Sequence, residues 1–130
     1  MIQRIQSIFL LVVVLCGVGF AVFVPFMRDV IVVSIWGINF SSVLLSLISI
    51  FMFKKRTLQM RFCFWLILIN ILLIALLFFV YILARDSGYY TFIDFVKFSS
   101  FSLIATISAF LARRYIKKDE DLVRSADRIR

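Results

Sequence analysis

Charged residues are absent from three long stretches of this sequence, and this feature constrains the fold more than any other. No Lys, Arg, Asp or Glu occurs in residues 5–27, 30–53 or 62–84. Each stretch exceeds the roughly 20 residues that a helix needs to cross a hydrocarbon core about 30 Å thick. Since 64% of the 130 residues are hydrophobic, a soluble globule would lack the polar residues to cover its surface. The sequence therefore predicts an all-α integral membrane protein and excludes a soluble enzyme or a disordered tail.

Four crossings account for the chain as a single domain, residues 1–130. The crossings are predicted at about 7–27, 33–53, 62–83 and 92–116. The fourth is the least obvious because Asp94 and Lys97 interrupt its start, but these side chains lie three residues apart and can pair at the membrane interface. The tail, 113–130, is predicted to extend the fourth helix out of the membrane. We expect an antiparallel four-helix bundle.

Basic residues are distributed unevenly between the two sides that four crossings define. With both termini on one side, twelve of the fifteen Lys and Arg residues lie on that side. The twelve are Arg4, Lys54, Lys55, Arg56, Arg61, Arg113, Arg114, Lys117, Lys118, Arg124, Arg128 and Arg130, and the other three are Arg28, Arg85 and Lys97. Cytoplasmic loops carry an excess of Lys and Arg, so both termini are predicted to be cytoplasmic. The net charge of +8 then belongs to that face, where lipid headgroups explain it and no nucleic acid is expected.

Small and polar residues recur on one face of the second and the fourth predicted helix, and helices in lipid associate through such residues. They are Asn39, Ser42, Ser46 and Ser49 on the second helix and Ser102, Ala105, Ala109 and Ala112 on the fourth. A rise of about 1.5 Å per residue places four polar residues at a common depth, on the order of 10–15 Å from the cytoplasmic side. These four are Cys16, Ser46, Asn70 and Thr106.

This polar layer has two interpretations, a structural clamp between helices and a ligand or ion site. Because an amide that faces lipid is costly, Asn70 is expected to point inward and to bond to Ser46 or Thr106. The layer contains no intramembrane Asp, Glu, Lys or Arg, so it would make a poor path for protons or cations. We therefore favour the clamp.

The C-terminal segment ARRYIKKDEDLVRSADRIR is a mixed-charge amphipathic helix with an apolar stripe at Tyr115, Leu122, Ala126 and Ile129. Three interpretations stay open: a solvated helix packed against the inner loop, a docking helix for a cytoplasmic protein or a second copy of the chain, and a helix on the lipid surface. The candidate partner-binding residues are Lys54, Lys55, Arg56, Arg61, Lys117, Asp119, Glu120, Leu122, Arg124, Asp127 and Arg128.

Residues that carry enzyme chemistry are scarce in this sequence. Histidine is absent, and Cys16 and Cys63 lie in apolar segments at different depths, without the spacing of a metal site. We therefore expect no enzyme, no metal and no cofactor. A small oligomeric transporter, channel or holin-like protein remains the alternative, because the serine faces could line a narrow pore. The first helix lacks the carboxylate on which small multidrug transporters depend.

Three segments resemble a known family. MIQRIQSIFLL, FMFKKRTLQMRFC and IKKDEDLVRSADRIR are similar to the domain of unknown function 4293 family of small bacterial four-helix membrane proteins. The resemblance covers the whole chain and implies an inner-membrane protein with both termini in the cytoplasm, but no activity. Many members carry a longer outer segment between the first two helices, which is almost absent here. The prediction is a scaffold or accessory subunit in the lipid bilayer that binds a protein partner or itself.

Overall fold

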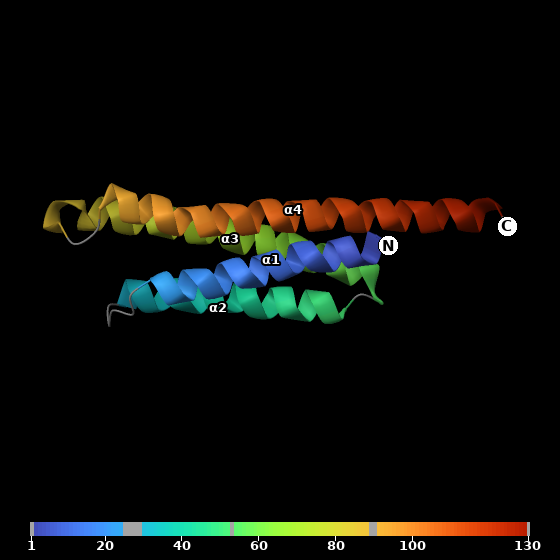
Figure 1. Ribbon diagram of the computed structural model, residues 1–130, viewed down its shortest axis with the longest axis horizontal. Coiled ribbons are helices and arrows are strands. Elements are labelled where there is room, and N and C mark those ends of the chain that lie inside the picture. Colours follow the sequence, from blue (N-terminus) through green and yellow to red (C-terminus); the bar gives the residue numbers. More distant parts are fainter. Residues whose placement is uncertain (1, 25–29, 53, 89–90, 130) are drawn as a thin grey trace.

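The computed structural model describes residues 2–24, 30–52, 54–88 and 91–129, and in these the chain forms four long α-helices that lie side by side (Figure 1). They are α1 (Ile2–Phe23), α2 (Val30–Phe51), α3 (Arg56–Ala84) and α4 (Phe92–Ile129), with the short 3-10 turn η1 (Arg85–Ser87) after α3. Each of the four is long and apolar enough to cross a membrane, which is the mark of a multi-pass membrane protein.

Three helices begin earlier than predicted: α1 at Ile2 instead of 7, α2 at Val30 instead of 33, and α3 at the basic loop. α3 begins at Arg56, six residues before the predicted start at 62, so Arg56 and Arg61 lie on a helix rather than in a loop. The reason is Gln59, which is buried and donates from Nε2 to the carbonyl oxygen of Ser49 at 3.1 Å. This bond holds the first turn of α3 against the end of α2. The predicted helix ends at 27 and 53, and the tail end at 130, lie outside the described residues.

Each helix contacts its neighbours in chain order, and α4 also packs along α1, which closes the arrangement into a ring. The contacts of α4 with α1 and α3 are the most extensive. The face that α4 contributes is the predicted one, with Ser102, Ala105, Ala109 and Ala112 all buried. Small side chains let helix backbones approach closely, so this face explains why α4 can lie between two neighbours.

Two apolar clusters fill the interior of the bundle, and buried polar residues lie between them. On α3, for example, Leu66 belongs to the first cluster and Leu73 to the second, with the buried Asn70 between the two. The outer surface is also apolar, with exposed side chains such as Leu15 and Phe40. Exposed apolar surface of this extent is unfavourable in water and suits acyl chains.

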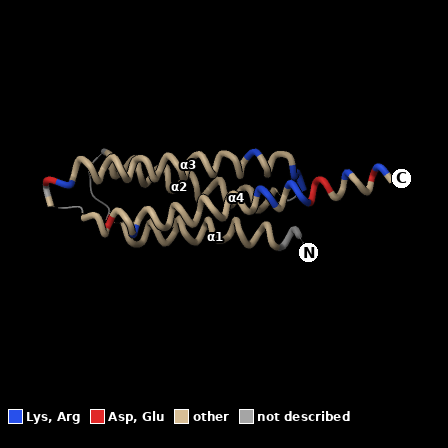
Figure 2. The backbone as a smooth tube through the Cα atoms, turned by 90° about the horizontal axis from the view of Figure 1, so that it is seen from above, with Lys and Arg blue, Asp and Glu red and all other residues tan. Residues whose placement is uncertain are grey.

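Charged residues gather at the two ends of the bundle, and the helices between the ends carry none (Figure 2). One end holds the start of α3 and the basic part of α4, and beyond it α4 continues past the other helices to the C-terminus (Figures 1 and 2). α4 has 38 residues, which at 1.5 Å per residue is about 57 Å, nearly twice the thickness of a hydrocarbon core.

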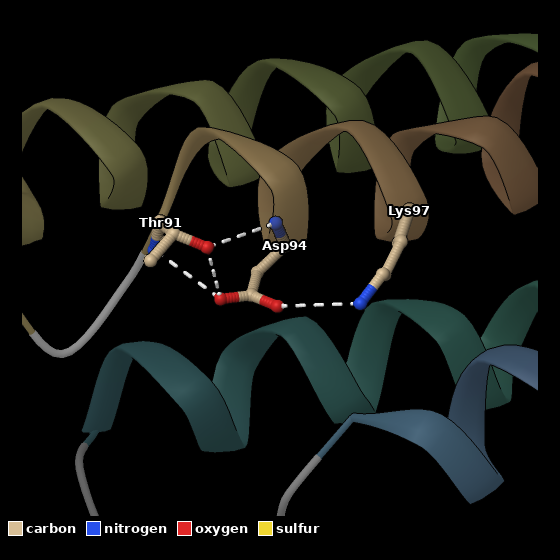
Figure 3. Close-up of polar contacts among 3 residues, drawn as sticks. All are labelled: Thr91, Asp94 and Lys97. Carbon is tan, nitrogen blue, oxygen red and sulfur yellow. Dashed lines mark hydrogen bonds and ion pairs between the residues drawn. The ribbon is translucent and has the colours of Figure 1, made fainter.

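The start of α4 is fixed by a reciprocal set of hydrogen bonds (Figure 3). The Thr91 backbone N–H and hydroxyl donate to Asp94 Oδ2 at 3.2 and 2.6 Å, and the Asp94 backbone N–H donates back to Thr91 Oγ1 at 3.4 Å. This is a capping box, which satisfies backbone groups that the first turn of a helix leaves unpaired. Asp94 Oδ1 also lies 4.0 Å from Lys97 Nζ, which confirms the predicted pairing of these two residues.

The close approach of α1 and α2 at Gly17 gives a test of the packing. A Cβ at Gly17 would overlap Cγ2 of Val43, whereas a Cβ at Gly37 on α2 would meet nothing within 4 Å. We expect Gly17→Ala to lower the free energy of unfolding by about 1–3 kcal/mol relative to Gly37→Ala, because a branched Val side chain cannot move aside freely. Both substitutions gain similar helix propensity, so their difference isolates the overlap. Thermal unfolding in detergent, followed by circular dichroism, measures it; equal midpoints for the two variants would contradict this packing.

Candidate functional site

The buried amide of Asn70 joins α3 to α2 in the middle of the bundle. Its side chain is only 3% exposed, and Nδ2 donates to Ser42 Oγ at 3.1 Å and to the Leu66 carbonyl oxygen at 2.8 Å. The expectation that Asn70 points inward therefore agrees with the structure. The expected partners, Ser46 and Thr106, are wrong: the partner is Ser42.

Ser46 and Thr106 bond to backbone carbonyl groups instead. Ser46 Oγ is fully buried and donates to the Leu10 carbonyl oxygen on α1 at 2.8 Å. Thr106 Oγ1 donates to the Ser102 carbonyl oxygen on its own helix at 2.7 Å. Both hydroxyls thus have their donors occupied away from Asn70.

A second buried amide, Asn39, joins α2 to α1 beside this pair. Its Nδ2 donates to the Gly17 carbonyl oxygen at 3.0 Å. The residues that meet around one point of the interior include Cys16, Gly17, Asn39, Ser42, Asn70 and Ser102. Compared with the predicted layer, the polar residue at this point is one helical turn away on two helices: Ser42 in place of Ser46 on α2, and Ser102 in place of Thr106 on α4.

The packing around Asn70 is tight. The side chains that surround it, among them Phe20 and Phe101, leave no room for a water molecule in the described part of the chain. The Ser102 hydroxyl is buried there and finds no hydrogen-bond partner among the described residues. An arrangement of hydrogen-bonded amides in a dry interior does what a clamp does, which is to fix how the helices face one another.

At the basic end, the start of α3 and the tail of α4 are in direct contact. Arg56 Nη1 lies 3.4 Å from Asp119 Oδ2, and both side chains are largely covered. One turn further along α4, Arg124 Nη2 donates to Glu120 Oε1 at 3.1 Å. Tyr115 stacks on Phe9 of α1 with ring centroids 5.5 Å apart. As far as Glu120, the tail therefore packs against the bundle, as one of the three interpretations requires.

Beyond Glu120 the tail leaves the bundle. Residues 121–129 are all exposed, including Leu122 at 49% and Ile129 at 88%. The predicted apolar stripe is thus divided, because Tyr115 packs on the bundle while Leu122 is half-exposed and Ile129 is mostly exposed. Asp127 and Arg128 belong to this exposed segment as well.

Five of the predicted partner-binding residues line one open groove between the tail and the start of α3. The groove measures about 650 Å³, and these five are Lys54, Lys55, Arg56, Glu120 and Arg124. Thr57, Leu58 and Val123 complete its lining. The structure does not bring Arg61 or Lys117 into this groove, since each lines a different hollow. We call this groove the tail groove.

Sequence reasoning missed Gln59, whose buried side chain ties α3 to α2. Its position in the sequence is the signal that could have found it. Gln59 precedes Cys63 by four residues, so on a helix both side chains lie on the same buried face.

In the described residues no three Cys, Asp or Glu side chains form a set that could hold a metal ion.

The partner of Asn70 can be tested by two double-mutant cycles. We expect Asn70→Ala and Ser42→Ala to be coupled by about 0.6 kcal/mol, and at most about 1.7 kcal/mol, the range of hydrogen bonds between membrane helices. The cycle of Asn70→Ala with Ser46→Ala is the matched control, and its coupling should be near zero. Unfolding in mixed micelles supplies the free energies. Stronger coupling to Ser46 than to Ser42 would restore the register predicted from the sequence.

Comparison with known proteins places the chain in a family. The model of the family described as "Domain of unknown function (DUF4293)" matches residues 27–129. Neither a curated protein nor a solved structure gives a significant match. The family match takes in α2, α3 and α4, and therefore both sides of the tail groove and the amide of Asn70. The four-helix chain, with the Asn70 amide buried at its centre and the basic groove at its end, belongs to this family of unknown function.

Proposed function

We propose that the chain is a scaffold or accessory subunit of a bacterial inner membrane, and that it binds a protein partner through its basic loop and tail. The helices form an antiparallel bundle with both termini in the cytoplasm. The observation that carries this proposal is the end of α4, which continues beyond the other helices (Figure 1). It carries exposed apolar residues such as Leu122 and Ile129. A membrane anchor needs no such segment.

The composition of the tail groove supports a partner with an acidic, amphipathic segment. Lys54, Lys55, Arg56 and Arg124 line the groove together with one carboxylate, Glu120. Asp119 pairs with Arg56 and Glu120 with Arg124, so the two lysines are the cations in the lining for which the described residues show no ion pair. Leu58 and Val123 add an apolar strip. Cations beside apolar side chains complement carboxylates beside apolar side chains.

The proposed topology draws support from charge and from hydrogen bonding. Twelve of fifteen Lys and Arg residues fall on the side of the termini, as the positive-inside rule requires of a cytoplasmic face. Ser46 of α2 donates to Leu10 of α1, and Asn39 of α2 donates to Gly17 of α1. From the first contact to the second, the residue number rises on α1 and falls on α2. Antiparallel neighbours pair in this way.

Transport remains the weaker candidate. The alternative of an oligomeric transporter or channel needs a polar path, and the interior of one copy is dry around Asn70 in the described residues. A pore between copies would have to use the outer faces, where the exposed side chains of α2 are mostly apolar, such as Phe40 and Leu44. We therefore carry the scaffold proposal forward.

The topology can be checked by labelling from one side of the membrane. In a chain with Cys16→Ser and Cys63→Ser, we expect Ser125→Cys to be inaccessible to an impermeant maleimide in intact cells and labelled after lysis. Asp86→Cys, in η1 at the other end of the bundle, should be labelled in intact cells. If Ser125→Cys reacts in intact cells and Asp86→Cys does not, the proposed orientation is wrong.

Partner binding can be checked by purification from native membranes in mild detergent followed by mass spectrometry. Truncation after Glu120 removes the exposed segment but retains Asp119 and its ion pair with Arg56, so the bundle should stay folded. We expect this truncation, and Leu122→Gln with Ile129→Gln, to lose a protein that the full chain retains. The full chain should also lose this protein in high salt. Salt shortens the Debye length from about 8 Å to about 3 Å and so weakens the attraction between exposed charges.

The matched control for these variants is Asp121→Asn with Ser125→Ala, two exposed tail positions outside the predicted set. The control should retain the partner. The partner should also bind the purified full chain directly, and less tightly after Lys54→Gln and Lys55→Gln. Recovery of the same proteins with all forms of the chain would rule the proposal out.

A further inference from the structure

A second groove lies between α3 and α4 on the outer surface of the bundle, next to the tail groove, with which it shares Thr57 in its lining. Its volume is about 500 Å³, and its lining is Thr57, Met60, Arg61, Phe64, Trp65 and Arg113. Two of these side chains are cations and three are large and apolar, and the lining contains no carboxylate. We call it the arginine groove.

The two arginines stand where the uncharged stretches begin. Arg61 is the last charged residue before the stretch 62–84 of α3, and Arg113 is the first after the stretch 98–112 of α4. Both are exposed, and the ion pairs of the described residues involve neither. In a membrane these positions lie at the boundary between acyl chains and headgroups.

Arg113 is held in place without losing its hydrogen-bond donors. Its guanidinium carbon lies 5.1 Å from the centre of the Phe64 ring, which is a cation–π contact. A guanidinium that rests on a ring face keeps its N–H groups free at its edge, and these match the oxygens of a phosphate. The aromatic ring thus orients a cation that has no anionic partner among the described residues.

The two aromatic side chains of the groove lie further along α3 than Arg61, inside the uncharged stretch. Phe64 and Trp65 follow Arg61 by three and four residues, so they lie one helical turn further into the uncharged stretch. They are 44% and 56% exposed, and their rings meet edge to face at 6.4 Å. Trp is enriched at membrane interfaces, where its ring contacts both acyl chains and headgroups.

We propose that the arginine groove binds an anionic phospholipid, with the phosphate between Arg61 and Arg113 and an acyl chain along Met60, Phe64 and Trp65. Basic pockets between transmembrane helices are known to hold anionic headgroups, and arginine binds phosphate through two parallel hydrogen bonds. A soluble phosphate would make no use of the aromatic side chains. An acidic protein segment would have to enter the bilayer to reach Trp65.

Quenching of tryptophan fluorescence tests this proposal directly. The chain has two tryptophans, so Trp36→Phe leaves Trp65 as the reporter. The variant is reconstituted in vesicles of equal parts phosphatidylglycerol and phosphatidylcholine, in which only one of the two lipids carries brominated acyl chains. We expect brominated phosphatidylglycerol to quench Trp65 more strongly than brominated phosphatidylcholine does. The difference should correspond to an affinity for phosphatidylglycerol about fivefold or more higher, since each cation near the surface raises the affinity for an anionic lipid severalfold.

Two charge-matched variants separate a specific groove from general attraction. Arg61→Gln with Arg113→Gln should bring the ratio of the affinities for the two lipids close to one. Arg114→Gln with Lys118→Gln removes two cations of α4 that line a neighbouring hollow without aromatic residues, and it should keep the preference. Arg61→Lys with Arg113→Lys keeps the charge but loses the paired hydrogen bonds, so an intermediate preference is expected. Circular dichroism confirms that each variant is folded.

The proposal fails if the unsubstituted groove shows no preference between the two lipids. It also fails if both charge-matched variants lose the preference equally, because attraction would then be diffuse. Glycerol phosphate added to the aqueous phase should leave the quenching unchanged. If it abolishes the preference, the ligand is a soluble phosphate and the lipid assignment is overturned.

Discussion

Apolar surface gives helices in lipid no reason to associate, so this bundle depends on the polar groups that join its helices. Among the described residues, α2 takes part in four such interhelical hydrogen bonds. Asn39 and Ser46 of α2 donate to carbonyl oxygens of α1, whereas Ser42 and Ser49 accept from α3. α4 relies on another device, the row of small side chains that lets it pack closely on α1 and α3. The helix with the richest polar face therefore fixes the rotation of its neighbours.

The faces of the helices could be predicted from the sequence, but the partners across them could not. The spacing of polar and small residues on α2 and α4 is a local property, and all eight predicted positions are buried. Which hydroxyl meets Asn70 depends on the relative height of two helices. An error of one turn, about 5 Å, exchanges Ser42 for Ser46. The start of α3 was misplaced by six residues, so depths counted along it could not be that accurate.

The ends of two helices show why one start was predictable and the other was not. Thr91 and Asp94 form a capping box, whose spacing stands in the sequence, and α4 begins at Phe92 as predicted. Lys55 precedes α3 without any side-chain cap, and the basic residues that follow oppose the helix dipole. That start is fixed by tertiary contacts instead, through Gln59 and the Arg56–Asp119 pair. Contacts of this kind leave no local pattern to read.

The acidic residues of the tail neutralise some of the basic residues at this end of the bundle and, in the described part of the chain, leave others unpaired. Asp119 and Glu120 lie next to Arg56 and Arg124, so part of the charge is balanced inside the protein. Arg61 and Arg113 line the neighbouring arginine groove, where the other lining side chains include aromatic rings and no carboxylate. The tail therefore pairs some cations of this end and leaves others, Arg61 and Arg113, without an ion pair among the described residues. A positive-inside count treats these basic residues as one group. The structure divides them between two surfaces of different chemistry.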